Sequence, residues 1–186
     1  MSRPPAVAAA LALLVLGGAA CTSGGSVAGQ GAASASSAQP GLDLTLLAAS
    51  RDGELAAVRS ALAAGASVRS ADDSGATALV HAAYGNHVEV AAALVAAGAD
   101  VNHQDRTQQS PYLISTAEVG DDPRLLELLL AHGADVRAVD AYRGTGLIRA
   151  ADRGFESIVR RLLAAGIDID HVDRLGVRRL GDGRGR

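Results

Sequence analysis

The chain has 186 residues, which is enough for one modest domain with extensions. Aromatic residues make up 2% of the chain and Trp is absent, so the core must be built from Ala, Leu, Val and Ile, which suits a row of thin, closely packed helices. The net charge of −3 argues against a nucleic-acid-binding protein, because that function requires a basic surface.

Residues 1–20 have the layout of a secretory signal peptide, with Arg3 as a positively charged start and an apolar run of eleven residues at 6–16. The run is too short for a mature transmembrane helix, which takes about 20 residues. Small residues precede Cys21, the only cysteine, and this spacing resembles the lipobox of bacterial lipoproteins, in which the cysteine is acylated. We therefore expect lipidation at Cys21, and an ordinary signal peptide cleaved elsewhere is the alternative.

Residues 21–40 are interpreted as a flexible linker. After Cys21 they consist almost wholly of Ser, Gly, Ala, Gln and Thr, a composition that buries little surface. A tether of this length has a root-mean-square reach of ~25 Å, which would hold the following domain away from a membrane.

Residues 41–173 contain a pattern that occurs four times. In its clearest copy, residues 77–102, two short apolar helical patterns are separated by Gly85 and Asn86. A glycine follows the second helical pattern in every copy, with separations of 33, 35 and 33 residues, at Gly65, Gly98, Gly133 and Gly166. A fixed period of this size indicates stacked units, because one unit cannot bury its own apolar face.

The residues at the start of the units recur as well as the glycines at their ends. Thr77, Ser110 and Thr145 occupy matching places, and the second unit reads T-A-L, A-A, H-V-E-V and L-V-A-A-G-A-D-V-N in order. With T-G-L, A-A-D-R-G and I-V-R-R-L-L-A-A-G in the fourth unit, the sequence over about residues 42–173 resembles the ankyrin repeat family. The resemblance implies an all-α solenoid of four helix-turn-helix units joined by short β-hairpin loops.

The sequence departs from the family pattern at one column between the repeats. Val80, Leu113 and Ile148 stand where the family usually has a histidine, and only Pro111 keeps its proline. We therefore expect the repeats to stack more by apolar contact than by hydrogen bonds from that histidine.

The first repeat, residues 42–68, is expected to be the N-terminal cap. It lacks the Thr start but has apolar residues at helical spacing, namely Leu46, Leu47, Ala49, Val58 and Leu62. A terminal repeat needs a polar outer face. We assign charged residues to that face, namely Asp43, Arg51, Asp52, Glu54 and Arg59.

The third repeat is two residues longer than its neighbours, and the excess falls within residues 119–123. Asp122 is predicted to cap the second helix of this repeat, with Pro123 in the first turn, where a missing N–H costs nothing. The insertion is therefore interpreted as structural.

A fifth unit begins after residue 173 and does not continue. Arg178, Arg179 and Leu180 stand in place of Thr-x-Leu, so the C-terminal cap is predicted to be incomplete and residues 174–186 to be a disordered tail with five arginines. The tail is either a basic segment for anionic lipid or nucleic acid or a truncated or frame-shifted end, and we favour the second reading. Part of the fourth repeat's apolar side is then expected to be uncovered, including Ile158, Leu162 and Leu163.

A column of aspartates precedes the Thr/Ser start, or its expected place, by five residues, at Asp72, Asp105, Asp140 and Asp173. The ankyrin resemblance places it on the hairpins, and we favour a structural role, because Asp side chains bond nearby backbone amides in turns. Residues 41–173 contain 19 acidic residues and 11 arginines, a net charge of −8. This charge would favour a basic partner, mainly through its association rate.

The sequence has no Gly-rich phosphate loop, no paired cysteines, no His-x-x-x-His and no Gly-x-Ser-x-Gly turn. His81, His87 and His103 are interpreted as surface or inter-repeat histidines rather than metal ligands. We therefore expect no catalysis, no metal and no cofactor.

The positions best suited to binding are those that do not repeat. On the hairpins these are Asp73, Ser74, His103, Gln104, Arg106, Gln108, Gln109, Tyr142 and Arg143. On the first helices they are His81, Tyr84, Glu118, Arg149, Asp152 and Arg153. The ankyrin resemblance places both sets on the concave surface that holds partners, and Tyr and Arg often carry interface energy.

We interpret the chain as an exported, monomeric scaffold or regulator of a partner protein, anchored to the bacterial cell membrane by lipid or otherwise secreted or periplasmic, with no nucleic-acid partner. A small-ligand or metal-binding surface lipoprotein is the second hypothesis. The scaffold requires a shallow groove of polar and aromatic residues, whereas the ligand-binding protein requires a closed cavity with converging polar groups.

Overall fold

The structure is a computed structural model that describes residues 40–167. The described part of the chain forms eight α-helices and no strand. In chain order they are α1 (Pro40–Asp52), α2 (Leu55–Ala63), α3 (Ala78–Tyr84), α4 (Val88–Ala96), α5 (Pro111–Ala117), α6 (Pro123–Ala131), α7 (Gly146–Arg153) and α8 (Glu156–Ala164). None of these helices combines the length and apolar character of a membrane span. The predicted signal peptide with Cys21, the linker before Pro40 and the C-terminal tail lie outside the described residues.

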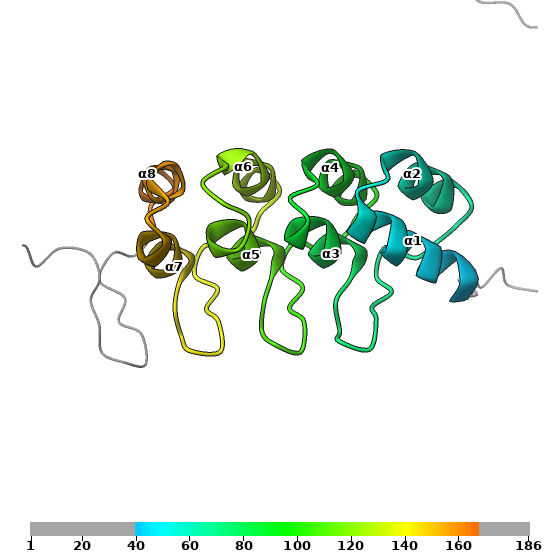
Figure 1. Ribbon diagram of the computed structural model, residues 1–186, viewed down its shortest axis with the longest axis horizontal. Coiled ribbons are helices and arrows are strands. Elements are labelled where there is room, and N and C mark those ends of the chain that lie inside the picture. The colour runs from blue at the N-terminus through cyan, green and yellow to red at the C-terminus, as the bar shows by residue number, and fades with distance from the viewer. Residues whose placement is uncertain (1–39, 168–186) are drawn as a thin grey trace, which may run out of the picture. The chain divides into compact units, whose positions relative to one another are not determined.

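The helices are arranged as four pairs in two rows (Figure 1). Each pair contributes one helix to the row of α1, α3, α5 and α7, here called the inner helices, and one to the row of α2, α4, α6 and α8, the outer helices. Three hairpins, residues 66–77, 99–110 and 134–145, project on the side of the inner row (Figure 1). The first and third hairpins each contain one antiparallel bridge, Ala71 with Thr77 and Val139 with Thr145. The predicted all-α fold of four repeating helix pairs is confirmed.

Every outer helix ends in the same way at the glycine that defines the period. Gly65, Gly98, Gly133 and Gly166 have φ values of 96°, 88°, 84° and 76°, which only glycine adopts at low cost. The residue after each glycine donates its N–H to a carbonyl five residues earlier, as Ala99 does to Leu94 at 3.0 Å. This left-handed termination stops the outer helix and turns the chain into the next hairpin.

The core is mainly aliphatic and consists of two clusters of buried residues, both of which include residues of the third repeat. Leu79, Leu94 and Leu125 are fully buried, and Val80, Leu113 and Ile148 have exposed fractions of 0%, 0% and 6%. The prediction that apolar contact takes over at the family's histidine column is confirmed. The core also contains one larger side chain, that of Tyr112. Its hydroxyl donates a hydrogen bond to the Val136 carbonyl at 3.3 Å. A methyl group at Gly146 would collide with that hydroxyl, so the glycine makes room for the tyrosine.

The insertion in the third repeat has a structural role, as predicted. Asp122 caps α6 by accepting a hydrogen bond from the Arg124 N–H at 3.1 Å, and Pro123 is the first residue of that helix. Asp121 reaches the next repeat and accepts from the N–H groups of Ser157 at 3.1 Å and Ile158 at 3.0 Å. Because the residue before α8 supplies no side-chain cap, the insertion caps this helix from the neighbouring repeat.

Two predictions about the ends of the repeat row are wrong. Asp43 was assigned to the outer face, but it is 7% exposed and accepts hydrogen bonds from the Ser67 N–H at 2.7 Å and the Ser70 hydroxyl at 2.6 Å. Without the Thr start, α1 extends to 13 residues, and Asp43 ties it to the first hairpin.

At the other end, Ile158 and Leu162 are fully buried, and only Leu163, 46% exposed, is uncovered as expected. The two buried residues face the inner helices of the third and fourth repeats, where they pack with Tyr112 and Leu147. The helical period turns Leu163 away from that contact.

Candidate partner-binding surface

The hairpins are held in shape by the aspartate column. Asp105 accepts hydrogen bonds through Oδ1 from the N–H groups of Thr107 at 2.8 Å and Gln109 at 3.0 Å. Asp72 and Asp140 make the same pair of backbone contacts in their own hairpins. These bonds close the hairpin turns locally, so the structural interpretation of the described aspartates is confirmed.

Asp72 also fixes a predicted site residue. Its Oδ2 accepts a hydrogen bond from the His81 Nε2 at 2.8 Å, which joins the first hairpin to α3. Burial alone would raise the pKa of the Asp72 carboxyl, but hydrogen bonds from Ser74, Ala76 and His81 outweigh it and lower the pKa to about 2. His81 is therefore held by a carboxylate that stays charged over the ordinary pH range.

A cluster of side chains from the third and fourth repeats is centred on Arg149, whose side chain is only 12% exposed. Its guanidinium donates to Glu118 Oε1 at 2.8 Å, to Gln109 Oε1 at 2.8 Å and to Asp140 Oδ2 at 3.4 Å. Arg153 lies 3.6 Å from the same Glu118 oxygen. These five residues, together with Tyr84, are called the Arg149 cluster. It connects α5, α7 and two hairpins across a repeat boundary.

Tyr84 brings the second repeat into the Arg149 cluster. It ends α3, is 46% exposed and lies close to Thr107 of the next hairpin. Partial burial, together with the nearby charges of Asp105 and Glu118, raises the pKa of the Tyr84 hydroxyl. The tyrosine is thus a half-exposed aromatic residue beside a fixed arginine and a carboxylate.

A second group of predicted residues links the first two hairpins to each other. The Arg106 guanidinium donates to the Asp73 carbonyl, and the Arg106 N–H donates to the Ser74 carbonyl at 3.0 Å. The His103 Nε2 donates to the Gly75 carbonyl at 2.8 Å. His103 and also His87, which bonds the Arg51 carbonyl at 3.1 Å, are inter-repeat histidines as predicted.

The remaining predicted residues are spread over the hairpins and α7. Gln108 and Arg143 occupy the hairpin position that Gly75 holds in the first hairpin, with φ values of 61°, 64° and 79°. Gln104, Tyr142 and Asp152 are exposed, Tyr142 to 76%. The structure therefore gathers only part of the predicted set into one cluster. Within residues 40–167 no three His, Cys, Asp or Glu side chains are grouped closely enough to hold a metal ion.

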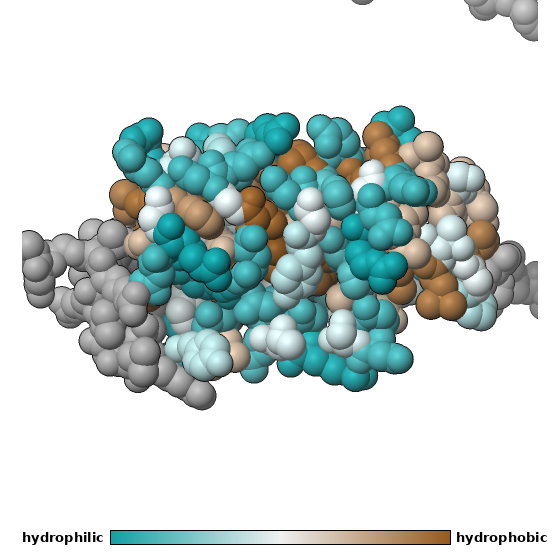
Figure 2. Space-filling view, viewed as in Figure 1, coloured by the Kyte–Doolittle hydropathy of each residue, from teal (hydrophilic) through white to brown (hydrophobic). Residues whose placement is uncertain are grey.

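Sequence reasoning assigned Asp140 to the turn alone and did not single out Thr107, although Asp140 also accepts a hydrogen bond from Arg149 and Thr107 lies close to Tyr84. The hydrogen bonds of Arg149 join residues from 9 to 40 positions apart, and no sequence motif marks them. The molecular face shown in Figure 2 is mainly hydrophilic, with smaller apolar patches among the helices.

A family model described as ankyrin repeats (3 copies) matches residues 33–105. The repeating helix pairs and hairpins continue in the same register to residue 167. The chain belongs to the ankyrin-repeat family. Ankyrin repeats mediate binding to other proteins, so this chain carries a protein–protein interaction module.

Curated relatives extend the ankyrin-repeat match. The chain is 35% identical over 131 residues to the ankyrin repeat protein YahD of Escherichia coli (strain K12), an alignment that covers 70% of this chain and 64% of that protein. It is also 35% identical over 108 residues to SH3 and multiple ankyrin repeat domains protein 1 of Homo sapiens and of Mus musculus, over 58% of this chain and 5% of those proteins. The chain thus spans less than two thirds of the length of these relatives.

Proposed function

We propose that this ankyrin-repeat chain is a scaffold or regulator that binds its partner protein on the surface formed by the inner helices and the hairpins. The observation that carries the proposal is the Arg149 cluster, in which a nearly buried arginine is fixed by three partners and stands beside the half-exposed Tyr84. Side chains that are already ordered lose little entropy on binding. Tyr and Arg are also the residue types that most often dominate interface energies.

The charge of the repeat domain supports a basic partner. Residues 41–173 carry a net charge of −8, and Glu118 of the Arg149 cluster is partly exposed. A negative field increases the rate at which a basic protein associates and has less effect on how slowly it dissociates. Raised salt should therefore slow association of such a partner.

The partner surface can be tested by affinity capture from membrane extracts of the native host with the full chain as bait. Tyr84→Ala should weaken binding of the captured protein by about 2 kcal/mol, or roughly 30-fold in Kd, as expected for a central aromatic residue. Arg160→Ala is the matched control, because this exposed arginine lies on the outer helix α8. Equal affinity of the Tyr84→Ala and wild-type chains would contradict the proposal.

We further propose that the chain is exported and anchored by a lipid on Cys21. The support is the signal layout of residues 1–20 and the small residues before the single cysteine. Growth with an alkyne-tagged palmitate should label the wild-type protein, and Cys21→Ser should lose both the label and membrane association. Equal labelling or equal membrane association of the Cys21→Ser protein would contradict acylation as the anchor.

A further inference from the structure

The junctions between successive repeats differ in one side chain. Between the second and third repeats, the Asn102 amide donates to the Gly133 carbonyl at 3.1 Å and accepts from the Asp135 N–H at 2.8 Å. One carboxamide therefore supplies both a donor and an acceptor to the loop that follows the next outer helix. It joins the two loops across the junction.

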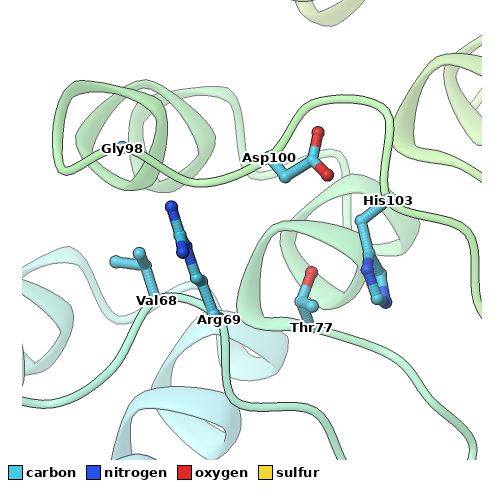
Figure 3. A pocket seen from close by; sticks show the side chains of 6 residues that line it. All are labelled: Val68, Arg69, Thr77, Gly98, Asp100 and His103. Carbon is cyan, nitrogen blue, oxygen red and sulfur yellow. The ribbon is translucent and has the colours of Figure 1, made fainter. Parts of the chain in front are cut away.

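Arg69 occupies the corresponding place, 33 residues earlier, between the first and second repeats. Arg69 has no carboxamide, and in the described part of the chain its side chain makes no hydrogen bond to the facing Gly98–Asp100 loop. A cleft of about 350 Å³ is present at this junction. Figure 3 shows its lining, which consists of Val68, Arg69, Thr77, Gly98, Asp100 and His103.

The cleft is lined by one cationic and one anionic side chain, those of Arg69 and Asp100. Arg69 extends toward the loop that carries Gly98, and Asp100 lies on the opposite wall (Figure 3). The guanidinium can only donate hydrogen bonds and the carboxylate can only accept them. An isolated anion would be repelled by Asp100 and an isolated cation by Arg69, whereas a neutral group with a donor and an acceptor could use both walls.

Thr77 is a further polar group directed into the cleft. The residue is 5% exposed, and Figure 3 shows its hydroxyl pointing to the space between Arg69 and Asp100. The equivalent Ser110 and Thr145 use their hydroxyls to cap α5 and α7, but the Thr77 side chain makes no such cap. The Thr77 hydroxyl is therefore not engaged in capping its own helix, and it can donate or accept a hydrogen bond from its place in the lining of the cleft.

We propose that this cleft binds a primary carboxamide, the side chain of an Asn or Gln presented by a partner polypeptide. The carboxamide oxygen accepts from Arg69 or Thr77, and its NH2 group donates to Asp100. It supplies the chemistry that Asn102 supplies from within the chain at the next junction. The cleft shares only His103 with the predicted partner-binding residues, so it is a recognition site separate from the Arg149 cluster.

The test is an NMR titration of the ¹⁵N-labelled chain with N-acetyl-L-asparagine methylamide and its glutamine counterpart. Both compounds should produce saturable shifts of the backbone amide signals of Thr77, Gly98, Asp100 and His103. The matched compounds with Leu or Asp side chains have the same blocked backbone and should not do so. Absence of saturable shifts with both carboxamides, or equal shifts with the Asp compound, would overturn the proposal.

The substitution Arg69→Asn gives the second arm of the test. It places an internal carboxamide where Asn102 stands at the next junction, so it should raise the urea midpoint and abolish the saturable shifts. Arg59→Asn, at an exposed position of α2, should leave both unchanged. Saturable shifts that persist in Arg69→Asn would refute the carboxamide site, and this result would not affect the Tyr84 binding test.

Discussion

At the scale of single residues, the backbone is strained at one position of the hairpin turns. Gln108 and Arg143 adopt the left-handed conformation that Gly75 adopts in the first hairpin. A side chain in this region costs roughly 1–2 kcal/mol relative to glycine. The sequence analysis selected Gln108 and Arg143 because the residue type at their position differs between repeats. The structure shows that the backbone conformation at this position is the same in all three hairpins.

Gln108→Gly should therefore raise the free energy of unfolding by about 0.5–1 kcal/mol, since relief of the left-handed strain exceeds the added entropy of the unfolded glycine. Urea unfolding provides the measurement. Gly75→Ala is the opposite change, because its Cβ would lie 3.3 Å from the Arg106 backbone nitrogen at a φ of 79°. It should lower stability, and a loss of stability in Gln108→Gly would show that the turn is not strained.

The Asp72 carboxyl predicts a pH dependence of stability. Its pKa is about 2 in the folded chain, whereas an unfolded aspartate has a pKa of about 3.9. The folded state therefore holds fewer protons between these values, so this contribution is complete above the unfolded pKa and is lost as the pH falls through the folded pKa. The urea midpoint should fall between about pH 4 and pH 2.

Asp72→Asn should lower the midpoint at neutral pH and make it less sensitive to acid than that of the wild type. Asn keeps an oxygen for the turn but cannot carry the charge that holds His81. If the two proteins lost stability in parallel on acidification, Asp72 would not be a source of the pH dependence.

At the scale of the helices and hairpins, contacts between neighbouring repeats fall into an apolar core and a polar inner surface. The core was predictable, because the helical spacing of Leu and Val and the recurring glycine identify which faces pack and where each outer helix ends. The hydrogen bonds of Arg149 were not predictable, because they depend on which side chains of adjacent repeats lie opposite one another. Asp43 was misassigned for the same reason, as its partners Ser67 and Ser70 lie beyond the following helix.

Arg149→Ala should lower the free energy of unfolding by about 1.5–3 kcal/mol, because it leaves the nearly buried Asp140 without its cation and removes bonds to Glu118 and Gln109. Arg149→Lys should recover only part of this loss, since an ammonium cannot reproduce the guanidinium fork.

The exposed pair of Arg160 and Glu156 supplies the control, and Arg160→Ala should change stability by less than about 0.5 kcal/mol. A double-mutant cycle of Arg149→Ala with Glu118→Gln measures how much of the loss belongs to that pair. Equal effects of Arg149→Ala and Arg160→Ala would mean that the Arg149 cluster does not stabilise the repeat boundary.

At the scale of the whole molecule, the repeats form a row in which the main contacts of each helix pair are with its neighbours in the described part of the chain. The inner helices and the hairpins together form the inner surface of this row, which carries polar and aromatic side chains. The outer helices form its outer surface. The period predicted the row, and the resemblance of the repeated motifs indicated its family. The choice of binding residues on the inner surface stays a prediction.

Photo-crosslinking in the native host tests this account most directly. Benzoylphenylalanine is introduced at Tyr84 or Tyr142 on the inner surface and at Glu89 or Arg160 on the outer helices. We predict a shared crosslinked product from the two inner positions and none from the two outer positions. A partner crosslinked from the outer positions and not from Tyr84 or Tyr142 would contradict the assigned surface.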